Sequence, residues 1–122
     1  MLFADDDPGM RTIVVMNLEA EGFEVTVVED GDAALIEIER ALPDLIVLDV
    51  MMPGRDGFEV LRALKEQPKT AAIPVVLLTA KAADADIWEG WKSGADFYMT
   101  KPFDPEELAR FANHVLGFGG KL

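Results

Sequence analysis

The stretch 44–57, which reads DLIVLDVMMPGRDG, restricts the fold more than any other part of the chain. It contains four consecutive apolar residues, 45–48, and this run ends in a single carboxylate, Asp49. Pro43 precedes the run and Pro53 follows it, a setting typical of a strand buried on both faces of a parallel sheet. In open parallel sheets, ligands gather beyond the carboxyl ends of the strands. Asp49 is therefore predicted to lie at the functional edge of such a sheet.

Strand and helix patterns alternate along the whole chain. Strands are predicted over 2–4, 24–28, 45–49, 74–78 and 97–100. Helices are predicted over 8–21, over a segment that includes 34–41, and over 58–67, 84–93 and 105–116. This alternation predicts an α/β fold, a single-domain doubly wound (βα)5 sandwich with helices on both faces of a parallel sheet. The intervening segment 68–72 is expected to be a polar linker.

Local chemistry adds detail to the first helix. Asp7 stands directly before Pro8, and because Asp caps helices and Pro suits the first helical position, Asp7 is predicted to be a cap rather than a ligand. Helical spacing predicts a shared buried face for Met10, Ile13, Val14 and Leu18.

The composition limits the function classes. With 122 residues, about half of them hydrophobic, the chain can form one domain with a real core. The domain is expected over 1–117, with 118–122 as a flexible tail or the start of a linker. The absence of cysteine excludes disulfides and thiol catalysis, and the net charge of −12 argues against nucleic-acid binding by this domain. No signal peptide or membrane span is evident, so a cytoplasmic location is expected.

Polar residues follow the predicted strands, namely Asp5, Asp6, Asp49, Thr79 and Lys101. Because the carboxyl ends of parallel strands share one edge, these side chains are expected to meet. Two carboxylates about 4 Å apart repel by roughly 4 kcal/mol at an effective dielectric constant of ~20, so three of them require raised pKa values or a cation. Carboxylates without His or Cys favour a hard ion, and Mg²⁺ fits a site with few protein ligands.

Such a site is suited to phosphoryl transfer. Asp49 would act as the nucleophile. The metal, Thr79 and Lys101 would neutralise the three oxygens on which negative charge must be accommodated.

Several motifs together resemble the receiver domain of bacterial two-component response regulators. They are the acidic pair Asp5 and Asp6, LIVLDVMMPGRDG around Asp49, VVLLTA around Thr79 and YMTKPF around Lys101. The resemblance covers almost the whole chain and implies a flavodoxin-like sheet with strand order 2-1-3-4-5. It also implies that Asp49 receives a phosphoryl group from the phosphohistidine of a sensor histidine kinase or histidine phosphotransfer protein. Such a domain catalyses only its own phosphorylation and dephosphorylation.

The same resemblance assigns metal-binding roles. Asp6, Asp49 and the backbone carbonyl of Met51 would hold Mg²⁺, and Asp5 would act on the ion through a water. Met51 and Lys81 would flank the path of the water that hydrolyses the phosphoaspartate.

Phosphoryl binding and switching are assigned in the same way. Thr79 and Lys101 would bind the phosphoryl oxygens, and Tyr98 would turn inward when Thr79 is drawn toward the phosphate. The bond between Lys101 and Pro102 is usually cis in the family, which fits the special status of X-Pro bonds.

Partner surfaces are also implied. Val15 and Met16 lie off the buried face of the first helix, and family members dock their kinase partly through this helix. The face formed by 84–93, 97–100 and 105–116 would regulate an output domain or a downstream protein.

Some receivers use that output face for a phosphorylation-dependent dimer. Receivers joined to winged-helix domains usually carry two arginines where Phe111 and Asn113 stand here, and often an Asp where Phe97 stands. The interhelical ion pairs of that dimer are therefore disfavoured in this chain.

Two other function classes fit the strand-end aspartate less well. A phosphatase of the haloacid dehalogenase type needs a second acid two residues after the nucleophile, where this chain has Met51. A flavodoxin-like flavin binder needs a phosphate-binding loop rich in Ser, Thr and Gly after the first strand, and the acidic run 5–7 would repel that phosphate.

Overall fold

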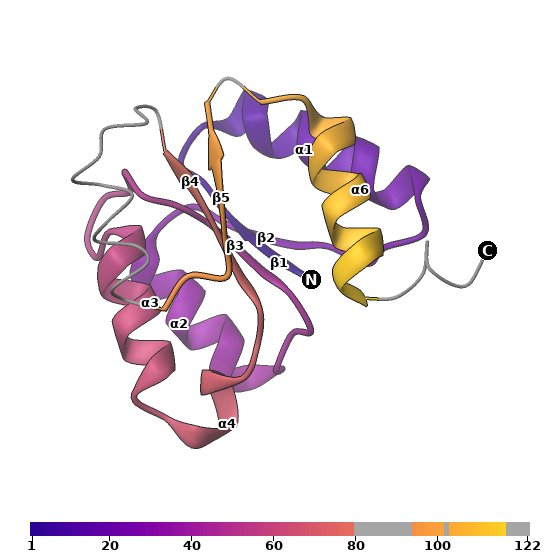
Figure 1. The fold of residues 1–122 in the computed structure, drawn as a ribbon. Coiled ribbons are helices and arrows are strands. Elements are labelled where there is room, and N and C mark those ends of the chain that lie inside the picture. Colours follow the sequence, from indigo (N-terminus) through magenta and orange to yellow (C-terminus); the bar gives the residue numbers. More distant parts are fainter. Residues whose placement is uncertain (80–93, 102, 117–122) are drawn as a thin grey trace.

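The fold is seen in a computed structural model that describes residues 1–79, 94–101 and 103–116. In this part of the chain, parallel strands form one sheet in the order β2-β1-β3-β4-β5. Helices pack against both faces of the sheet (Figure 1). The predicted doubly wound α/β sandwich with strand order 2-1-3-4-5 is confirmed.

The strands are short, and those at the centre of the sheet are buried. They are β1 (Leu2–Ala4), β2 (Thr26–Val28), β3 (Ile46–Asp49), β4 (Val75–Thr79) and β5 (Phe97–Thr100). Every residue of β3 and β4 is buried, as the apolar run before Asp49 predicted. The first strand has only three residues, yet it pairs with both β2 and β3.

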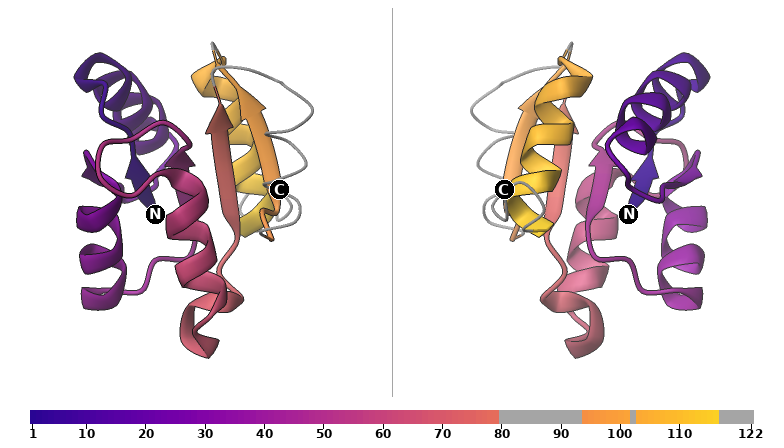
Figure 2. Two further views of the ribbon diagram at one scale, coloured as in Figure 1. Left: turned by 90° about the vertical axis from the view of Figure 1, so that its left-hand side faces the viewer. Right: turned by 90° about the vertical axis from the view of Figure 1, so that its right-hand side faces the viewer.

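The helices form a layer on each side of the sheet. They are α1 (Pro8–Ala20), α2 (Gly31–Arg40), α3 (Gly57–Lys65), α4 (Pro68–Ala71) and α6 (Pro105–Leu116). One face is covered by α1 and α6, and the other by α2 and α3 (Figures 1 and 2). None of the helices within the described ranges is long and apolar enough to cross a bilayer.

Side chains alternate between the two faces of each strand, so the sheet contributes to two separate cores. On β3, Val47 packs into the core under α1 and α6, whereas Leu48 packs into the core under α2 and α3. Both residues are fully buried.

The expected buried face of α1 needs one correction. Ile13 is 48% exposed, so its predicted burial is wrong, whereas Val14 and Leu18 are buried and Met10 is partly buried. The stripe of α1 that faces the core is therefore narrower than the apolar pattern of the sequence.

The segment after α3 also differs from expectation. The predicted linker 68–72 contains the single-turn helix α4, in which Pro68 occupies the first turn. Thr70 is buried there, and its hydroxyl donates to the Leu64 carbonyl at 2.6 Å. The predicted helix 84–93 lies outside the described residues.

The loop between β3 and α3 is fixed by close backbone packing. A Cβ on Gly57 would lie 2.7 Å from the Asp49 carbonyl oxygen and 2.9 Å from the Cα of Val50, so only glycine permits this approach. Asp56 then begins α3 with a capping box, in which its carboxylate accepts the Glu59 N–H at 2.9 Å. The course of the loop is thereby set directly beside Asp49.

Candidate functional site

The carboxyl ends of the central strands bring together polar residues that are far apart in sequence. Asp5 follows β1, Asp49 ends β3 and Thr79 ends β4. The register places Thr79 opposite Thr100, the residue before Lys101. The Lys101 N–H also donates to the Thr79 carbonyl at 2.7 Å. The parallel register therefore gathers these residues at one edge of the sheet.

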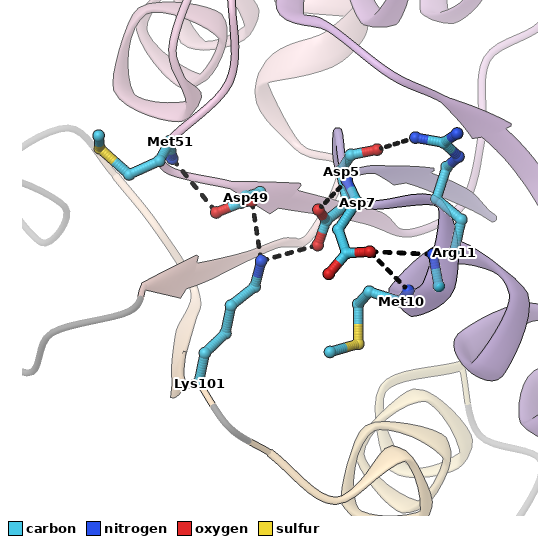
Figure 3. A network of polar contacts seen from close by, with 8 residues as sticks. Asp5, Asp7, Met10, Arg11, Asp49, Met51 and Lys101 are labelled. Carbon is cyan, nitrogen blue, oxygen red and sulfur yellow. Dashed lines mark hydrogen bonds and ion pairs between the residues drawn. The ribbon is translucent and has the colours of Figure 1, made fainter.

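Lys101 joins two carboxylates at this edge (Figure 3). Its Nζ donates to Asp49 Oδ2 at 2.8 Å and to Asp5 Oδ2 at 2.9 Å. The side chain of Lys101 is 21% exposed, that of Asp49 5% and that of Asp5 0%. Because these ion pairs are largely removed from water, they are screened less than surface pairs.

Other contacts fix the loop that carries Asp5. The Asp5 Oδ1 accepts the Asp7 N–H at 2.9 Å. The Asp5 carbonyl accepts a hydrogen bond from Arg11 Nη1 at 2.7 Å (Figure 3). Asp7 is the predicted cap of α1, since its carboxylate accepts the Gly9 N–H at 2.9 Å. The contact of Arg11 could not be predicted from the sequence, because helical spacing does not show which carbonyl a long side chain will reach.

Three carboxylates form a candidate cation site. Within the described ranges, one oxygen from each of Asp5, Asp6 and Asp49 can be chosen so that all lie within 4.8 Å of one another. Asp5 and Asp49 are buried, whereas Asp6 is exposed and lines an open cavity of about 470 Å³ together with Met51. A donor set of carboxylates beside an open, water-accessible space fits a hard, partly hydrated cation such as Mg²⁺.

The site contains more negatively than positively charged side chains. Burial raises the pKa of the Asp49 carboxyl, the hydrogen bond from Lys101 opposes this rise, and the charge of Asp5 adds to it. Burial alone would lower the pKa of Lys101, but the hydrogen bonds to Asp49 and Asp5 outweigh burial, so the pKa is raised. A divalent cation would neutralise charge that the single ammonium leaves uncompensated.

The remaining predicted site residues that the structure describes lie on β4, on β5 and in the loop after β3. Thr79 is 3% exposed at the end of β4. Tyr98 lies on β5 and is partly buried against the core under α2 and α3. The Met51 N–H donates to Asp49 Oδ1 at 3.2 Å, while the Met51 side chain points outward and the residue is 70% exposed. Lys81 and Pro102 lie outside the described residues.

The predicted docking residues lie on α1. Met16 is 65% exposed, and Val15 is partly buried. Both line a shallow surface pocket that also includes Arg11 and Val27. This pocket therefore spans α1 and the edge strand β2.

The fold and the strand-end site together define a class of protein. The family model for the response regulator receiver domain matches residues 1–113, and this chain belongs to that family. Members of this family are signalling domains of two-component systems. The resemblance carried by the motifs around Asp49, Thr79 and Lys101 is thus confirmed.

Individual relatives carry this domain in different settings. The chain is 42% identical over 107 residues to the phosphate regulon transcriptional regulatory protein PhoB of Rhizobium meliloti, covering 87% of this chain and 47% of that protein. The receiver domain of a signal transduction histidine kinase from Syntrophus aciditrophicus superposes with a TM-score of 0.89 at 34% identity, covering 95% of this chain and 88% of that one. Chemotaxis protein CheY4 of Vibrio cholerae gives 0.87 at 34% identity, covering 93% and 95%. The chain spans about half the length of the curated relatives it matches.

Proposed function

We propose that the chain accepts a phosphoryl group on Asp49 and uses it to change the surface that partners recognise. The observation that carries this proposal is the bridge from Lys101 to Asp49 and Asp5 at the edge where three carboxylates meet. The donor would be the phosphohistidine of a sensor histidine kinase or a histidine phosphotransfer protein. The family membership supports this choice of donor.

In the proposed transfer, an oxygen of Asp49 forms a bond to phosphorus as the bond between phosphorus and the donor histidine nitrogen breaks. The electron pair of that bond stays on the histidine nitrogen, and no oxidant or reductant is needed. Asp6, Asp49 and the Met51 carbonyl would hold Mg²⁺, and Asp5 would contact the ion through a water. The ion would supply positive charge that neutralises the phosphoryl oxygens. Lys101 and Thr79 would hold the other oxygens, and Asp5 would keep Lys101 at the site.

The response to phosphorylation is proposed to pass along β5. Thr79 would move toward the new phosphoryl group and leave room for Tyr98 to turn inward. The stacked rings of Phe97 and Phe111, with centroids 4.4 Å apart, lie on β5 and α6, the described part of the proposed output face. This aromatic pair supports an output contact, to an attached domain, a downstream protein or a second copy, that differs from the arginine-based dimer.

The acidity of the chain bears on DNA binding. A net charge of −12 supports the proposal that this domain does not itself grip DNA. A relative from Mycolicibacterium smegmatis is named a DNA-binding response regulator, and the match covers 46% of its length. Any DNA contact of a longer protein that contains this chain is therefore assigned to another domain.

Phosphorylation is tested with a small-molecule donor. Incubation of the chain with acetyl phosphate and Mg²⁺ is expected to give an adduct of about 80 Da by intact-mass measurement, which corresponds to one phosphoryl group. A chelator should prevent its formation, because the metal neutralises the phosphoryl charge. Peptide mapping should place the adduct on Asp49. Turnover of many phosphomonoesters without a retained adduct would instead support a phosphatase.

Kinase docking is tested on α1. The double substitution Val15→Glu and Met16→Lys is expected to slow transfer from the cognate kinase at least about tenfold, because it places charge in an apolar contact. The rate with acetyl phosphate should stay unchanged, since neither residue reaches the strand-end site. Ile36→Glu is the matched control, because Ile36 is 71% exposed on α2, on the other layer. If the kinase transferred its phosphoryl group to the double variant at the wild-type rate, docking through these two residues would be ruled out.

A further inference from the structure

The first turn of α2 supports the loop that carries Met51. A Cβ on Gly31, the first residue of α2, would lie 2.0 Å from the carbonyl oxygen of Arg55 and 2.8 Å from its carbonyl carbon. These are backbone atoms, so they cannot rotate away as the end of a flexible side chain could. Gly31 does not have a positive φ, unlike Gly22 and Gly54. Glycine is therefore needed at position 31 for close approach and not for an unusual backbone conformation.

Neighbouring contacts hold the same part of the loop. Arg55 Nε donates to Asp32 Oδ1 at 2.9 Å, although both side chains are more than half exposed. Gly54 has a φ of 73°, and a Cβ there would lie 3.2 Å from Asp32 Oδ2. Residues 54 and 55 are thus seated on the beginning of α2. The exposed ion pair contributes less to this seating than the backbone contact does, because solvent screens it.

The loop connects this contact to the strand-end site. The beginning of the loop, at Asp49 and Val50, is held by Gly57, which packs against the backbone of these two residues. Between the two glycine contacts lies Met51, whose N–H donates to Asp49 Oδ1 at 3.2 Å. Met51 and Gly54 also line the cavity beside Asp6. A displacement of residue 55 would therefore be transmitted to the backbone of Met51 over a short, doubly fixed segment.

We infer that Gly31 is a positioning residue for the site, although it lies on a different element and touches none of the three carboxylates. By admitting the Arg55 backbone, Gly31 sets where Met51 places its N–H and its carbonyl relative to Asp49. The consequence for Mg²⁺ binding rests on the proposed function. The consequence for the Met51 N–H does not, because that hydrogen bond exists without any ion.

The test compares two glycine substitutions. Gly31→Ala forces the Arg55 backbone away from α2. Gly22→Ala is the control, because Gly22 has a φ of 93° and no neighbouring heavy atom within 4 Å of its added Cβ. Gly22→Ala should therefore lower stability through backbone strain without moving the loop.

Two readouts separate positioning from a general loss of stability. In metal-free protein, Gly31→Ala is expected to speed hydrogen exchange of the Met51 amide and to shift its NMR signal. In calorimetric titration with Mg²⁺ alone, it is expected to weaken binding about tenfold, the scale found when supports of metal ligands are removed. Gly22→Ala should lower the melting temperature but leave both readouts as in the wild type.

Further variants keep the inference testable if Gly31→Ala does not fold. Asp30→Ala removes the cap whose carboxylate accepts the Ala33 N–H at 2.7 Å, so it loosens the first turn of α2 without adding a clash. It should change both readouts in the same direction by a smaller amount. Arg55→Ala removes only the ion pair and should change Mg²⁺ affinity by less than about twofold.

The outcomes distinguish the inference from the proposed function. If the Met51 amide and the Mg²⁺ affinity respond equally to Gly31→Ala and Gly22→Ala, the positioning role is overturned while the proposed function stands. If the wild-type chain binds no Mg²⁺ and forms no adduct with acetyl phosphate, the proposed function is overturned. The Met51 amide would then still decide whether Gly31 positions the loop.

Discussion

Asp49→Asn is expected to abolish the phosphoryl adduct and, at the same time, to stabilise the metal-free fold near neutral pH. The adduct is lost because an amide does not replace the carboxylate as nucleophile. The stability gain follows from burial, which disfavours the charged form of Asp49 and raises its pKa. An asparagine of the same shape avoids that cost, so we expect a gain in the free energy of unfolding.

The stability gain of Asp49→Asn should depend on pH. Because the pKa of Asp49 is raised in the folded state, the folded protein binds a proton more tightly than the unfolded chain does. Proton binding at Asp49 therefore stabilises the folded wild type. This contribution is fully present below the unfolded pKa of about 4 and is lost as pH rises through the higher folded pKa. The advantage of Asp49→Asn should therefore grow from acidic to neutral pH.

Urea unfolding in chelator across that pH range measures the effect. Asp6→Asn is the matched control for this stability measurement, because Asp6 is an exposed neighbour whose neutralisation should change stability little in chelator. An Asp49→Asn protein that is less stable than the wild type at neutral pH would show that the Lys101 ion pair outweighs burial. An adduct that persists in Asp49→Asn would place the acceptor elsewhere.

Lys101→Ala is expected to have two large effects. It removes the ammonium from Asp49 and Asp5, which are 5% and 0% exposed, and leaves two buried carboxylates facing each other. Breaking a buried pair in this way costs about 3–5 kcal/mol, and the partial exposure of Lys101 places the expected loss toward the lower end. The rate of adduct formation should fall by about 10²–10³-fold, because the proposed function relies on this ammonium to neutralise the phosphoryl oxygens.

Mg²⁺ and pH should modify the stability effect of Lys101→Ala. Added Mg²⁺ should restore part of the stability, because it neutralises the same carboxylates. The raised pKa of Lys101 means that its contribution is fully present below the unfolded lysine pKa of about 10.4 and is lost as pH rises through the folded value. The part of the difference between variant and wild type that comes from the Lys101 ammonium should therefore shrink at alkaline pH.

Lys69→Ala is the matched control for this experiment. Lys69 also forms an ion pair, with Glu39, but both side chains are about half exposed, so the expected loss is at most about 1 kcal/mol. Equal losses for Lys69→Ala and Lys101→Ala would contradict the special role of burial at the strand-end site. Thermal or urea unfolding of both variants, with and without Mg²⁺, makes the comparison.

The sheet and the approximate place of its functional edge could be predicted from the sequence, because alternating strands and helices leave few topologies. The carboxyl ends of parallel strands must then meet, whatever the intervening sequence, and this brings Asp49 near Asp5. Periodicity did not show that Lys101 bridges both carboxylates, since that contact depends on the final twist of the sheet and on one side-chain conformation.

Features that depend on the depth of packing could not be predicted. Ile13 fits the helical spacing of its buried neighbours but falls at the edge of the stripe and is exposed. The helix at Pro68–Ala71 is too short for a periodic signal, and it forms around a buried Thr70. The need for glycine at position 31 could not be predicted, because the Arg55 backbone that requires it lies 24 residues later in the sequence.

The two cores on opposite faces of the sheet have a consequence for how such domains can diversify. The proposed kinase contact lies on α1, whereas the loop beside Asp49 is supported by α2 and α3. In this proposal, partner choice and the support of the loop beside Asp49 therefore lie in different layers, which are joined by strands whose side chains alternate between them. We expect that exposed residues of α1 such as Met16 can be exchanged without altering the support of the loop beside Asp49, unlike Arg11, which holds the Asp5 carbonyl.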